Sequence, residues 1–538
     1  MLSKKEQSVL RNQLFRHLDG IVVAPISYAL DQEGVTNYLL KNKKTTLTEL
    51  TSHFDANDGY LNVALRALCS QGWLSQEVDN SDNSVTFSIN QQSQIAFDHF
   101  YMYKDVTELM KISENYSNRI FEIEPFLKLE STFKNFQNQF GIVLSSEVKT
   151  RKIQEQILTH IEGIIVGPTL VHLGMSGMFH KYFMQTRFRP EEFHKDPDAF
   201  GRLLTILTTL GWFKNINQAF EFTSKGLFFA KRASAYGVTV SYIPMLRKVS
   251  DLLFGNPLVL KNAIGTEEKH VDREMNVWGS GGAHTAYFRI VDEIIISIFN
   301  KPIDEQPKGF LDMGCGNGAF LAHLFSVVEN QTNRGKMLDE HPLLIIGVDY
   351  NQAALNVSRT NLIQADIWAK IIWGDIGNPD LLATDLKEKY NIHLEDLLNV
   401  RTFLDHNRMW ETPNESVKIR KSTSTGAYVT NGKRIHNNLV SESLKQHFSK
   451  WKPYIQKFGL LLIELHTVKP ALVAENIGNI AATAYDVTHG FSDQYIIEVD
   501  EFMEVLQEVG LVPEKNTHKK FPNSDLATVS INLFKEKE

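Results

Sequence analysis

The sequence predicts an α/β domain with a mostly parallel, Rossmann-like sheet, preceded by a mainly helical domain with two winged-helix-like repeats. Three observations carry this prediction. From about residue 305, strand-like apolar segments alternate with helix-like segments, which is the pattern of βαβ units. The first of these strands runs directly into a glycine-rich loop. Residues 1–235 contain a duplicated motif.

The duplication is visible in HLDGIVVAP at 17–25, which returns as HIEGIIVGP at 160–168 with five of nine positions identical. Each copy is followed by a helix-like segment, a Gly-Trp pair, and alternating polar and apolar residues at 84–89 and 219–224. A change from helical spacing to period two is typical of a helical unit that ends in a β-hairpin. His17 and His160 recur with the repeat, so we expect them to serve the fold and not catalysis.

The remaining segments complete the expected organisation. We expect repeat 1 at 1–95, a helical connector at 96–150, repeat 2 at 151–235, a helical linker and lid at 236–304, and the α/β domain at 305–538. Within the linker, the glycines at 279–282 should break the helical pattern before an amphipathic helix at 284–300. They serve either as a helix entry or, with Trp278 and His284, as a lid over a cofactor. The polar stretch 411–445 is expected to be an insertion over the carboxyl edge of the sheet.

The composition is ordinary for a globular protein, with 43% hydrophobic and 22% charged residues. The net charge of -7, from 56 Lys+Arg against 63 Asp+Glu, argues against an extended nucleic-acid-binding surface. Two cysteines exclude a disulfide framework and a cysteine zinc site. The start of the chain is polar and the apolar runs are strand-sized, so we expect a cytoplasmic protein that does not contact a membrane.

The expected strands of the α/β domain are GFLDM, LLIIGVDY, AKIIWGD, DLLNVRTF and GLLLIELH. The first strand leads into Gly314, Gly316 and Gly318, and such a loop brings backbone N–H groups close to a ligand. A dinucleotide fingerprint would read G-x-G-x-x-G, whereas the spacing here is G-x-G-x-G. Asp312, two residues ahead of the loop, would repel a pyrophosphate but suits the ammonium of an amino acid.

This pattern resembles motif I of the class I S-adenosylmethionine (SAM) methyltransferases. The resemblance implies that Asp349, at the end of the second strand, accepts hydrogen bonds from both ribose hydroxyls. It also implies that Asp375, with its neighbour Ile376 after the third strand, recognises the adenine. Asn317 and Tyr350 are expected to line the same site. Acids at successive strand ends favour SAM over a nicotinamide cofactor.

A second polar set follows the fourth and fifth strands. His406 comes just after the fourth strand, His466 ends the fifth, and His489, Asp493 and Gln494 share the loop HGFSDQ. In a parallel sheet these carboxyl-end positions converge on one crevice. Imidazoles together with amide or carboxylate oxygens suit Mn, Fe, Co or Ni with positions left open for substrate.

The segments DHNR, IELHTV, ATAYDVTHGFSDQY and NVWGSGGAHTAYF together resemble the metal-dependent C-methyltransferases of polyketide synthase starter-unit loading modules of the GNAT type. The first methyltransferase domain of the apratoxin assembly line is a similar member. The resemblance spans nearly the whole chain and implies a malonyl-type substrate on an acyl carrier protein. No sequence remains for a GNAT-like or carrier domain, so we expect action in trans on a separate carrier, a free acid or a CoA ester.

The residue roles are assigned as a hypothesis within this resemblance. His489 and Gln494 are the expected ligands of iron or manganese, with His466 as the third. His406 is the candidate base or a group that supports a metal ligand, and it could exchange roles with His466. Asp493 would orient a ligand histidine. Arg401 would hold a carboxylate of substrate or SAM, or form an ion pair at the sheet edge.

Three alternatives stay open. Winged-helix-like units ahead of a SAM domain are also similar to the small-molecule O-methyltransferases, which dimerise through that part; a homodimer and a metal-independent reaction with His489 as general base would follow. A nucleic-acid-binding protein is disfavoured because the repeats lack a basic recognition helix and LDHN stands where an Asn-Pro-Pro-Tyr-like motif would be. A SAM-binding scaffold without turnover is the third.

Overall fold

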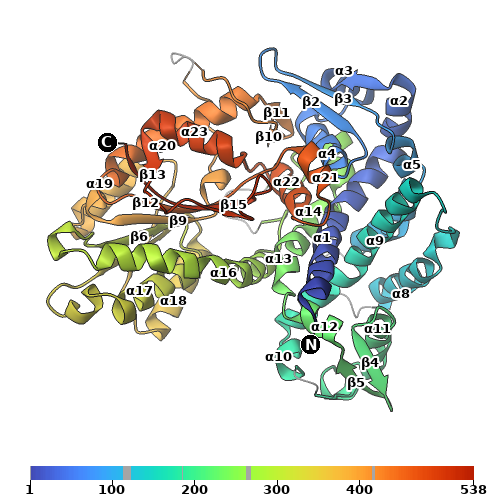
Figure 1. The fold of residues 1–538 in the computed structure, drawn as a ribbon, viewed down its shortest axis with the longest axis horizontal. Helices are drawn as coiled ribbons and strands as arrows, with labels where there is room; N and C mark the ends of the chain where they lie inside the picture. The colour runs from blue at the N-terminus through green and yellow to red at the C-terminus, as the bar shows by residue number, and fades with distance from the viewer. Residues whose placement is uncertain (1, 113–122, 184–185, 262–267, 415–418, 538) are drawn as a thin grey trace.

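The computed structural model describes residues 2–112, 123–183, 186–261, 268–414 and 419–537. The molecule has two halves that lie side by side (Figure 1). The N-terminal residues build a helical half, and the C-terminal residues build an α/β half around one large sheet. The long helix α16 (Arg273–Phe299) runs across the lower side of the view from the helical half to the sheet (Figure 1).

The sheet confirms all five expected strands and their parallel arrangement. Its order is β13-β15-β12-β9-β6-β7-β8, with β14 also paired to β15. The parallel strands are β6 (Gly309–Met313), β7 (Leu344–Asp349), β8 (Lys370–Trp373), β9 (Leu398–Thr402) and β12 (Leu460–Leu465). The antiparallel strands β13 (Leu511–Pro513), β14 (Lys519–Phe521) and β15 (Val529–Glu536) were not predicted. This is the class I methyltransferase arrangement, with the strand order reversing direction between β6 and β9.

Helices cover both faces of the sheet, as the nearly continuous burial of residues along β6, β9 and β12 requires. Phe310 of β6 packs into one hydrophobic cluster with helices α16 and α17 (Ala319–Gln331), and Leu311 packs into the opposite cluster. Helix α18 (Gln352–Gln364) joins the first layer; α19 (Pro379–Tyr390), α20 (Asn437–Ile455) and α23 (Val499–Val509) form the second. The strand ends therefore remain the accessible edge at which a ligand can bind.

The helical half contains the two expected repeats, each ending in a β-hairpin. Repeat 1 comprises α1 (Lys4–Gln32), α2 (Val35–Asn42), β1 (Lys44–Thr46), α3 (Leu47–Phe54), α4 (Asp58–Ser70), β2 (Ser75–Asp79) and β3 (Ser84–Ser88). Repeat 2 comprises α9 (Val148–Met175), α10 (Met178–Lys181), α11 (Pro197–Thr209), β4 (Phe213–Ile216), β5 (Ala219–Phe222) and α12 (Ser224–Ala230). In repeat 1 the added strand β1 pairs with β3 and widens the hairpin to three strands.

The duplicated motif forms the contact between the repeats. Helices α1 and α9 cross so closely that a Cβ on Gly20 would overlap the backbone of His160, and a Cβ on Gly163 would overlap the backbone of His17. Both histidines are fully buried. The Nδ1 of His17 bonds the hydroxyl of Tyr236 at 2.8 Å, and the Nδ1 of His160 bonds that of Tyr103 at 2.8 Å. This placement agrees with a role of the two histidines in the fold.

The crossing gives a testable stability prediction. Gly20→Ala should lower the free energy of unfolding by about 1–3 kcal/mol, because the added methyl forces two packed helices apart. Gly281→Ala is the matched control: a Cβ there meets nothing within 4 Å, and alanine in a helix is favoured by roughly 0.5–1 kcal/mol. Calorimetric unfolding of both variants checks this, and equal melting temperatures would contradict the close crossing.

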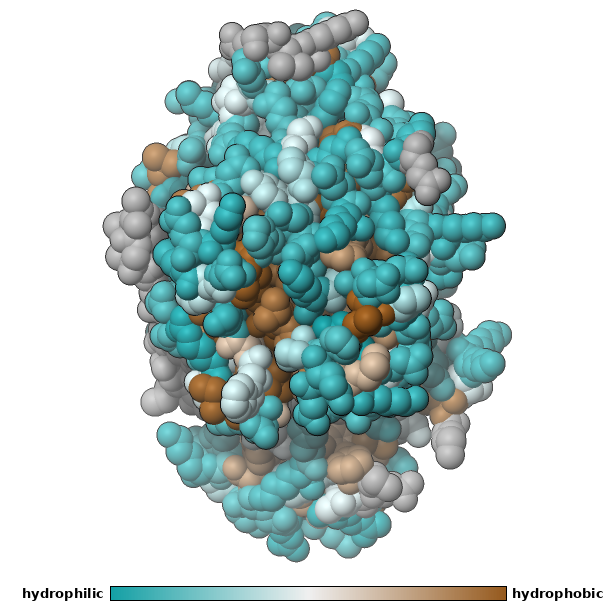
Figure 2. Space-filling model, turned by 90° about the vertical axis from the view of Figure 1, so that its left-hand side faces the viewer, coloured by the Kyte–Doolittle hydropathy of each residue, from teal (hydrophilic) through white to brown (hydrophobic). Residues whose placement is uncertain are grey.

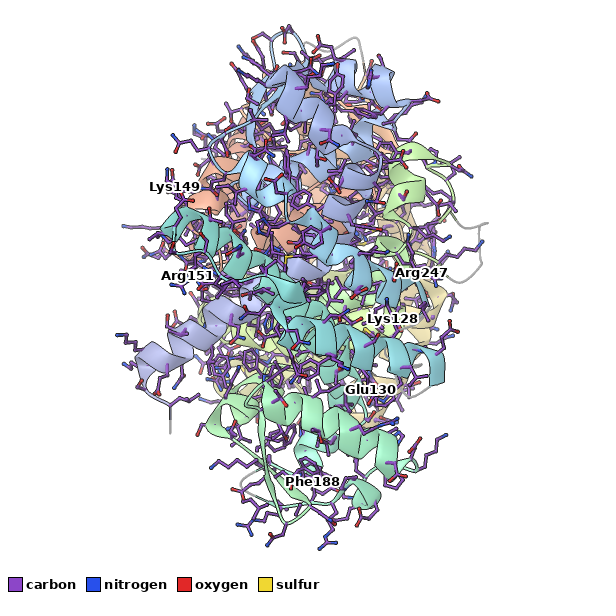
Figure 3. The ribbon with its side chains drawn as sticks, turned by 90° about the vertical axis from the view of Figure 1, so that its right-hand side faces the viewer. Lys128, Glu130, Lys149, Arg151, Phe188 and Arg247 are labelled. Carbon is purple, nitrogen blue, oxygen red and sulfur yellow. The ribbon has the colours of Figure 1, made fainter. Side chains whose placement is uncertain are left out.

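The connector between the repeats is helical, as expected: α5 (Ser93–Phe97), the 3-10 turn η1 (Phe100–Tyr103), α6 (Lys104–Ile112) and α8 (Ile123–Gln137). Figure 3 shows α8 on the outer face with Lys128 and Glu130. The Nζ of Lys128 contacts the Glu108 carboxylate of α6 at 2.6 Å, and the Glu130 carboxylate contacts the Nε of Arg202 in α11 at 3.3 Å. Ion pairs of this partly exposed kind contribute little to stability, so α8 depends mainly on its buried apolar face.

The tip of repeat 2 is held by an aromatic residue outside its strands. Phe188 lies against the β4–β5 hairpin (Figure 3), and its backbone N–H donates to the carbonyl of Phe220 at 3.0 Å. Its ring stacks on Tyr182 with a centroid separation of 4.4 Å. The hairpin therefore gains a third extended segment without forming a longer strand.

The expected helix break at 279–282 is wrong. Helix α16 starts at Arg273, capped by Asp272, and continues through these glycines. Gly279 packs against Gly237 of α13 (Ser234–Ser241) so closely that a Cβ on either would collide with the other backbone. Gly279 thus serves helix–helix contact, which outweighs the low helix propensity of glycine.

The same contact places Trp278 in the helical half. Its indole lies against Gly174 of α9, where a Cβ would be 3.0 Å away, so Trp278 does not cover the cofactor loop. The side chain of His284 lies outside those that the structure describes. The rest of the linker forms the short helices α14 (Ile243–Leu246) and α15 (Val249–Phe254).

The insertion contacts the helical half as well as the sheet. The 411–445 stretch contains the hairpin β10 (Tyr428–Thr430) and β11 (Lys433–Ile435), but its last residues belong to α20, so the polar segment ends earlier than expected. Residues 415–418 lie outside the described part. The N–H of Gly59 in α4 donates to the carbonyl of Gly432 at 3.0 Å, which joins the hairpin to repeat 1.

One helix among those described, α9, is long and apolar enough to cross a membrane by length and composition. Its apolar window is 72% buried within the molecule, as in the core helix of a globular protein. The apolar character of α9 is therefore explained by its packing against α1.

The face at the α/β end is mainly hydrophilic, with a group of apolar side chains near its centre (Figure 2).

Candidate active site

The glycine loop after β6 folds back on β7 and leaves space at the start of α17. Gly314, Gly316 and Gly318 have φ of 78°, 54° and 78°, a left-handed conformation that favours glycine. The N–H groups of Gly314 and Cys315 donate to the carbonyl of Val348 at 2.8 and 3.0 Å. A Cβ on Gly316 would meet nothing within 4 Å, so backbone and helix N-terminus are open to a ligand.

Asp312 presents a buried carboxylate without a partner. Its side chain is 2% exposed, and its Oδ1 has no hydrogen bond among the described residues. Burial, with the nearby charge of Asp349, raises the pKa of Asp312 well above its usual value. An ammonium bound here would remove this penalty. The orphaned oxygen beside an open glycine loop therefore fits the amino-acid end of SAM.

Asp349 is joined directly to the glycine loop. Its Oδ2 accepts from the N–H of Gly316 at 3.0 Å, and its Oδ1 accepts from the N–H of Asn351 at 2.8 Å. Burial raises the pKa of Asp349, while these two N–H groups lower it. A carboxylate has about four acceptor sites, so these N–H groups leave acceptor capacity for ribose hydroxyls.

The other expected cofactor residues lie along the same edge. Asp375 follows β8 and accepts from the N–H of Gly377 at 2.8 Å, and the buried Ile376 accepts through its carbonyl from Trp451 at 2.7 Å. Tyr350 is 58% exposed beside Trp373. Asn317 accepts from the N–H of Ala319 at the start of α17. The structure thus brings all eight predicted cofactor residues to three adjacent strand ends.

His406 forms a hydrogen-bonded pair with a carboxylate that the sequence reasoning missed. It lies in the 3-10 turn η7 (Asp405–Asn407) after β9, and its Nδ1 bonds the Glu464 carboxylate of β12 at 2.6 Å. An ionised carboxylate only accepts, so Nδ1 carries a proton, and in the uncharged ring the lone pair then lies on Nε2. Such a pair orients an imidazole and stabilises its protonated form. Glu464 stands two residues before the more conspicuous His466.

His489 lies against His406 from another element. It belongs to α22 (Ala482–Gly490), and the two rings meet edge to face with centroids 5.1 Å apart. The Nδ1 of His489 donates to the carbonyl of Tyr485 at 2.8 Å, which leaves the lone pair on Nε2. Burial lowers the pKa of His489 to about 3. At neutral pH this imidazole is uncharged.

The expected role of His466 as a metal ligand is wrong. Its Nδ1 bonds the carbonyl of Ile497 at 3.0 Å and its Nε2 bonds the hydroxyl of Ser530 at 2.8 Å. The ring is fully buried, and burial lowers its pKa to about 3. The unpredicted antiparallel strand β15 supplies Ser530, so both ring nitrogens are already used within the sheet.

Two further expectations are corrected. Asp493 does not orient a histidine: its carboxylate contacts the Nζ of Lys261 at 2.7 Å and the hydroxyl of Tyr60 at 3.2 Å. Of the two roles expected for Arg401, the structure shows the ion pair: its Nη1 is bonded to Asp405 at 2.6 Å, and the residue is fully buried. Neither side chain is available to a substrate in this arrangement.

The polar side chains around His406 and His489 fit a metal only in part. His406 and His489 each bond a carboxylate or a carbonyl through Nδ1, which is the usual outer arrangement of metal-binding histidines. The Nε2 atoms have no hydrogen bond to any described residue. Gln494 donates through Nε2 to Ser492 at 2.9 Å, which leaves its amide oxygen. Among the described residues, no three His, Cys, Asp or Glu side chains are grouped to hold a metal, so a metal here would need the amide oxygen and ligands from substrate or water.

The cofactor loop and the histidine pair belong to one site. A Cβ on Gly314 would lie 2.9 Å from the side chain of Leu404, two residues before His406. The loop follows β6 and His406 follows β9, the two neighbouring strands at which the sheet order reverses. Ligands of open α/β sheets bind at this position.

The pair of His406 and Glu464 leads to a prediction. Glu464→Gln should lower kcat by about 10–100-fold, because an amide neither fixes the Nδ1–H tautomer nor stabilises a protonated ring. The affinity for SAM should not change, since Glu464 is not in the cofactor loop. Steady-state methyl transfer and calorimetric SAM binding measure the two quantities. An unchanged kcat would contradict a role of His406 as the base in the reaction.

Three family models match the chain. A methyltransferase model described as the AprA MT2-like domain matches residues 268–532. Models of the AprA winged helix domain and the AprA N-terminal domain match residues 162–256 and 10–76. The three parts occur in the order that the duplicated helical half and the sheet define, and together they cover well over half of the chain. No curated protein matches.

Several solved structures are similar in fold. The mitomycin 7-O-methyltransferase MmcR is 12% identical with a TM-score of 0.40, covering 72% of this chain and 98% of that one. The CurJ carbon methyltransferase is 13% identical with a TM-score of 0.33, covering 76% and 99%. An O-methyltransferase family protein from Burkholderia thailandensis is 11% identical with a TM-score of 0.40, covering 74% and 100%. The family assignment depends on the matched models and the site: the chain belongs to the AprA family and is a SAM-dependent methyltransferase.

Proposed function

We propose that the chain transfers the SAM methyl group to the α-carbon of a malonyl-type acyl group, carried in trans by an acyl carrier protein, with assistance from iron or manganese. The observation that carries this proposal is the pair His406–His489. Two imidazoles with Nε2 lone pairs meet beside the cofactor loop, and a carboxylate stands behind one of them. The motif resemblance to starter-unit C-methyltransferases supplies the substrate class.

The residues divide the work as follows. Asp312 and Asp349 hold the ammonium and ribose of SAM. His406 Nε2 accepts the proton of the α-carbon, and Glu464 stabilises the imidazolium that forms. The carbanion electron pair attacks the methyl carbon, and the C–S bond breaks with its electrons on sulfur. His489 Nε2 and the Gln494 amide oxygen would hold the metal, which supplies Lewis-acid polarisation of the two substrate carbonyls.

A metal-independent O-methyltransferase is the second candidate. It is favoured by the position of His489, whose Nδ1 is bonded to Tyr485 so that Nε2 could accept a hydroxyl proton, and by the lack of a third His, Cys, Asp or Glu ligand in the described part of the site. In that case loss of the metal would leave the rate unchanged.

Intact-mass measurement tests the proposal. Malonyl-loaded carrier protein is incubated with SAM and the enzyme, either stripped of metal or reconstituted with Fe or Mn. A methyl-sized mass gain only with metal supports the proposal. A gain in both samples would show that the reaction does not require a metal. No gain in either sample, with SAM binding intact, would exclude the malonyl-carrier substrate and favour the small-molecule alternative.

A further inference from the structure

We infer that Arg66, in the first helical repeat, is a positioning residue for His489 and that the helical half is thereby part of the catalytic apparatus. The inference deepens the proposed function, since it rests on the role of His489 there. It concerns an arginine that lies outside the methyltransferase sheet and 420 residues from its partner.

Helix α4 of repeat 1 runs along α22, the helix that carries His489. Tyr60 stacks on Phe491 with ring centroids 5.2 Å apart. A Cβ on Gly490 would lie 2.7 Å from Val63. Residues 60, 63 and 66 share one face of α4 because they are spaced three apart. The C-terminal end of α22 therefore packs closely against α4.

Arg66 uses its whole guanidinium group to join α22 to two loops. Its Nε donates to Asp486 at 3.0 Å. Its Nη1 donates to the carbonyl of Thr425 at 2.6 Å, and its Nη2 donates to the hydroxyl of Thr467 and the carbonyl of Val468 at 3.0 and 2.9 Å. The side chain is 2% exposed. A planar fork with donors in fixed directions is a property of arginine that lysine lacks.

The position of Asp486 connects this network to catalysis. Asp486 lies one helical turn before His489, so the two side chains extend from the same face of α22. The hydroxyl of Thr467, just after β12, also donates to Asp486 at 2.5 Å. The strand that supplies Glu464 and the helix that supplies His489 therefore meet at Arg66.

The other end of α22 is also held by the helical half. Asp19 of α1 lies near the backbone of Ala484 in the first turn of α22, a favourable place for a carboxylate. Gln71 at the end of α4 donates to Asp19 at 3.2 Å and to the hydroxyl of Thr483 at 2.9 Å. Burial raises the pKa of Asp19 to about 7. With both ends fixed, the Arg66–Asp486 pair defines the depth at which His489 enters the site.

Buried ion pairs contribute little net stability, and replacing both partners by apolar residues is often tolerated. Two variants exploit this. Arg66→Lys keeps the charge and loses the fork, and the double variant Arg66→Met with Asp486→Met removes both charges. Leu65→Ala is the control, because Leu65 is a buried residue of the same helix outside the face that meets α22.

Each full-length variant is measured for kcat, for SAM affinity, and for hydrogen exchange of the 482–490 amides. We expect both Arg66 variants to lose about 10–100-fold in kcat, the cost of displacing a catalytic group by roughly 1 Å, with the Kd for SAM within about twofold. Exchange in 482–490 should rise in these variants and not in Leu65→Ala. Should Arg66→Lys fail to fold, the double variant alone decides.

A kcat that falls no further than in Leu65→Ala, or unchanged exchange in 482–490, would overturn the positioning role. The two proposals fail separately. If the wild-type enzyme transferred no methyl group to malonyl carrier protein, the proposed function would be wrong. The hydrogen-exchange measurement would still report whether Arg66 holds α22.

Discussion

His489→Ala should lower kcat by about 10²–10⁴-fold, the usual contribution of a positioned acid–base group, and leave the Kd for SAM nearly unchanged. The physical reason is specific to this ring. Its Nδ1–H is fixed by the carbonyl of Tyr485 and its Nε2 is left free beside His406. As a metal ligand or as a base, the ring acts through Nε2, so both candidate reactions need it.

The control for this prediction is His323→Ala. His323 lies on α17 in the same half of the molecule, with Nε2 bonded to Asp292 at 2.6 Å, and it has no place in the site. Its removal should leave kcat within about twofold. Single-turnover methyl transfer and calorimetric titration of SAM separate the outcomes. If the SAM affinity of His489→Ala fell as much as kcat, His489 would belong to the cofactor site or to the fold.

Asp349→Ala should raise the Kd for SAM by about 100-fold or more, since each hydrogen bond to a charged group contributes roughly 1.5–3 kcal/mol. The carboxylate is preorganised by the N–H groups of Gly316 and Asn351, so the substitution also loosens the glycine loop. The kcat at saturating SAM should fall less than the affinity, because the contact proposed for Asp349 is with the ribose and not with the reacting methyl group.

Isothermal titration of SAM into the two proteins measures this change. Asp339→Asn is the matched control. Asp339 is an exposed acid in the segment before β7, and its substitution removes one charge from the same half of the molecule. An Asp349→Ala variant that binds SAM like wild type would refute the ribose contact and with it the assignment of the β7 end.

The cofactor site was predictable from the sequence because its information is local. Asp312, the three glycines and Asp349 each stand at a fixed distance from an apolar strand, and parallel strands bring their carboxyl ends together whatever the rest of the chain does. The structure accordingly places them on neighbouring strands, with a direct bond from Gly316 to Asp349.

The histidine set was only partly predictable. His406 and His489 meet as expected, but His466 turns to Ser530 and the adjacent Glu464 takes the place in the site. The segment IELH predicts where the strand ends, but it does not predict which residue each side chain contacts. That choice depends on β15, an antiparallel strand 64 residues further along the chain.

By itself, the sequence determined the α/β class, the five parallel strands, the duplicated helical units and the cofactor loop, because periodicity and glycine spacing act over a few residues. Tertiary structure alone decided that the helix continues through Gly279, which packs against Gly237, and that Arg66 meets Asp486. These contacts join segments far apart in the chain, and their geometry exists only after both helices have packed.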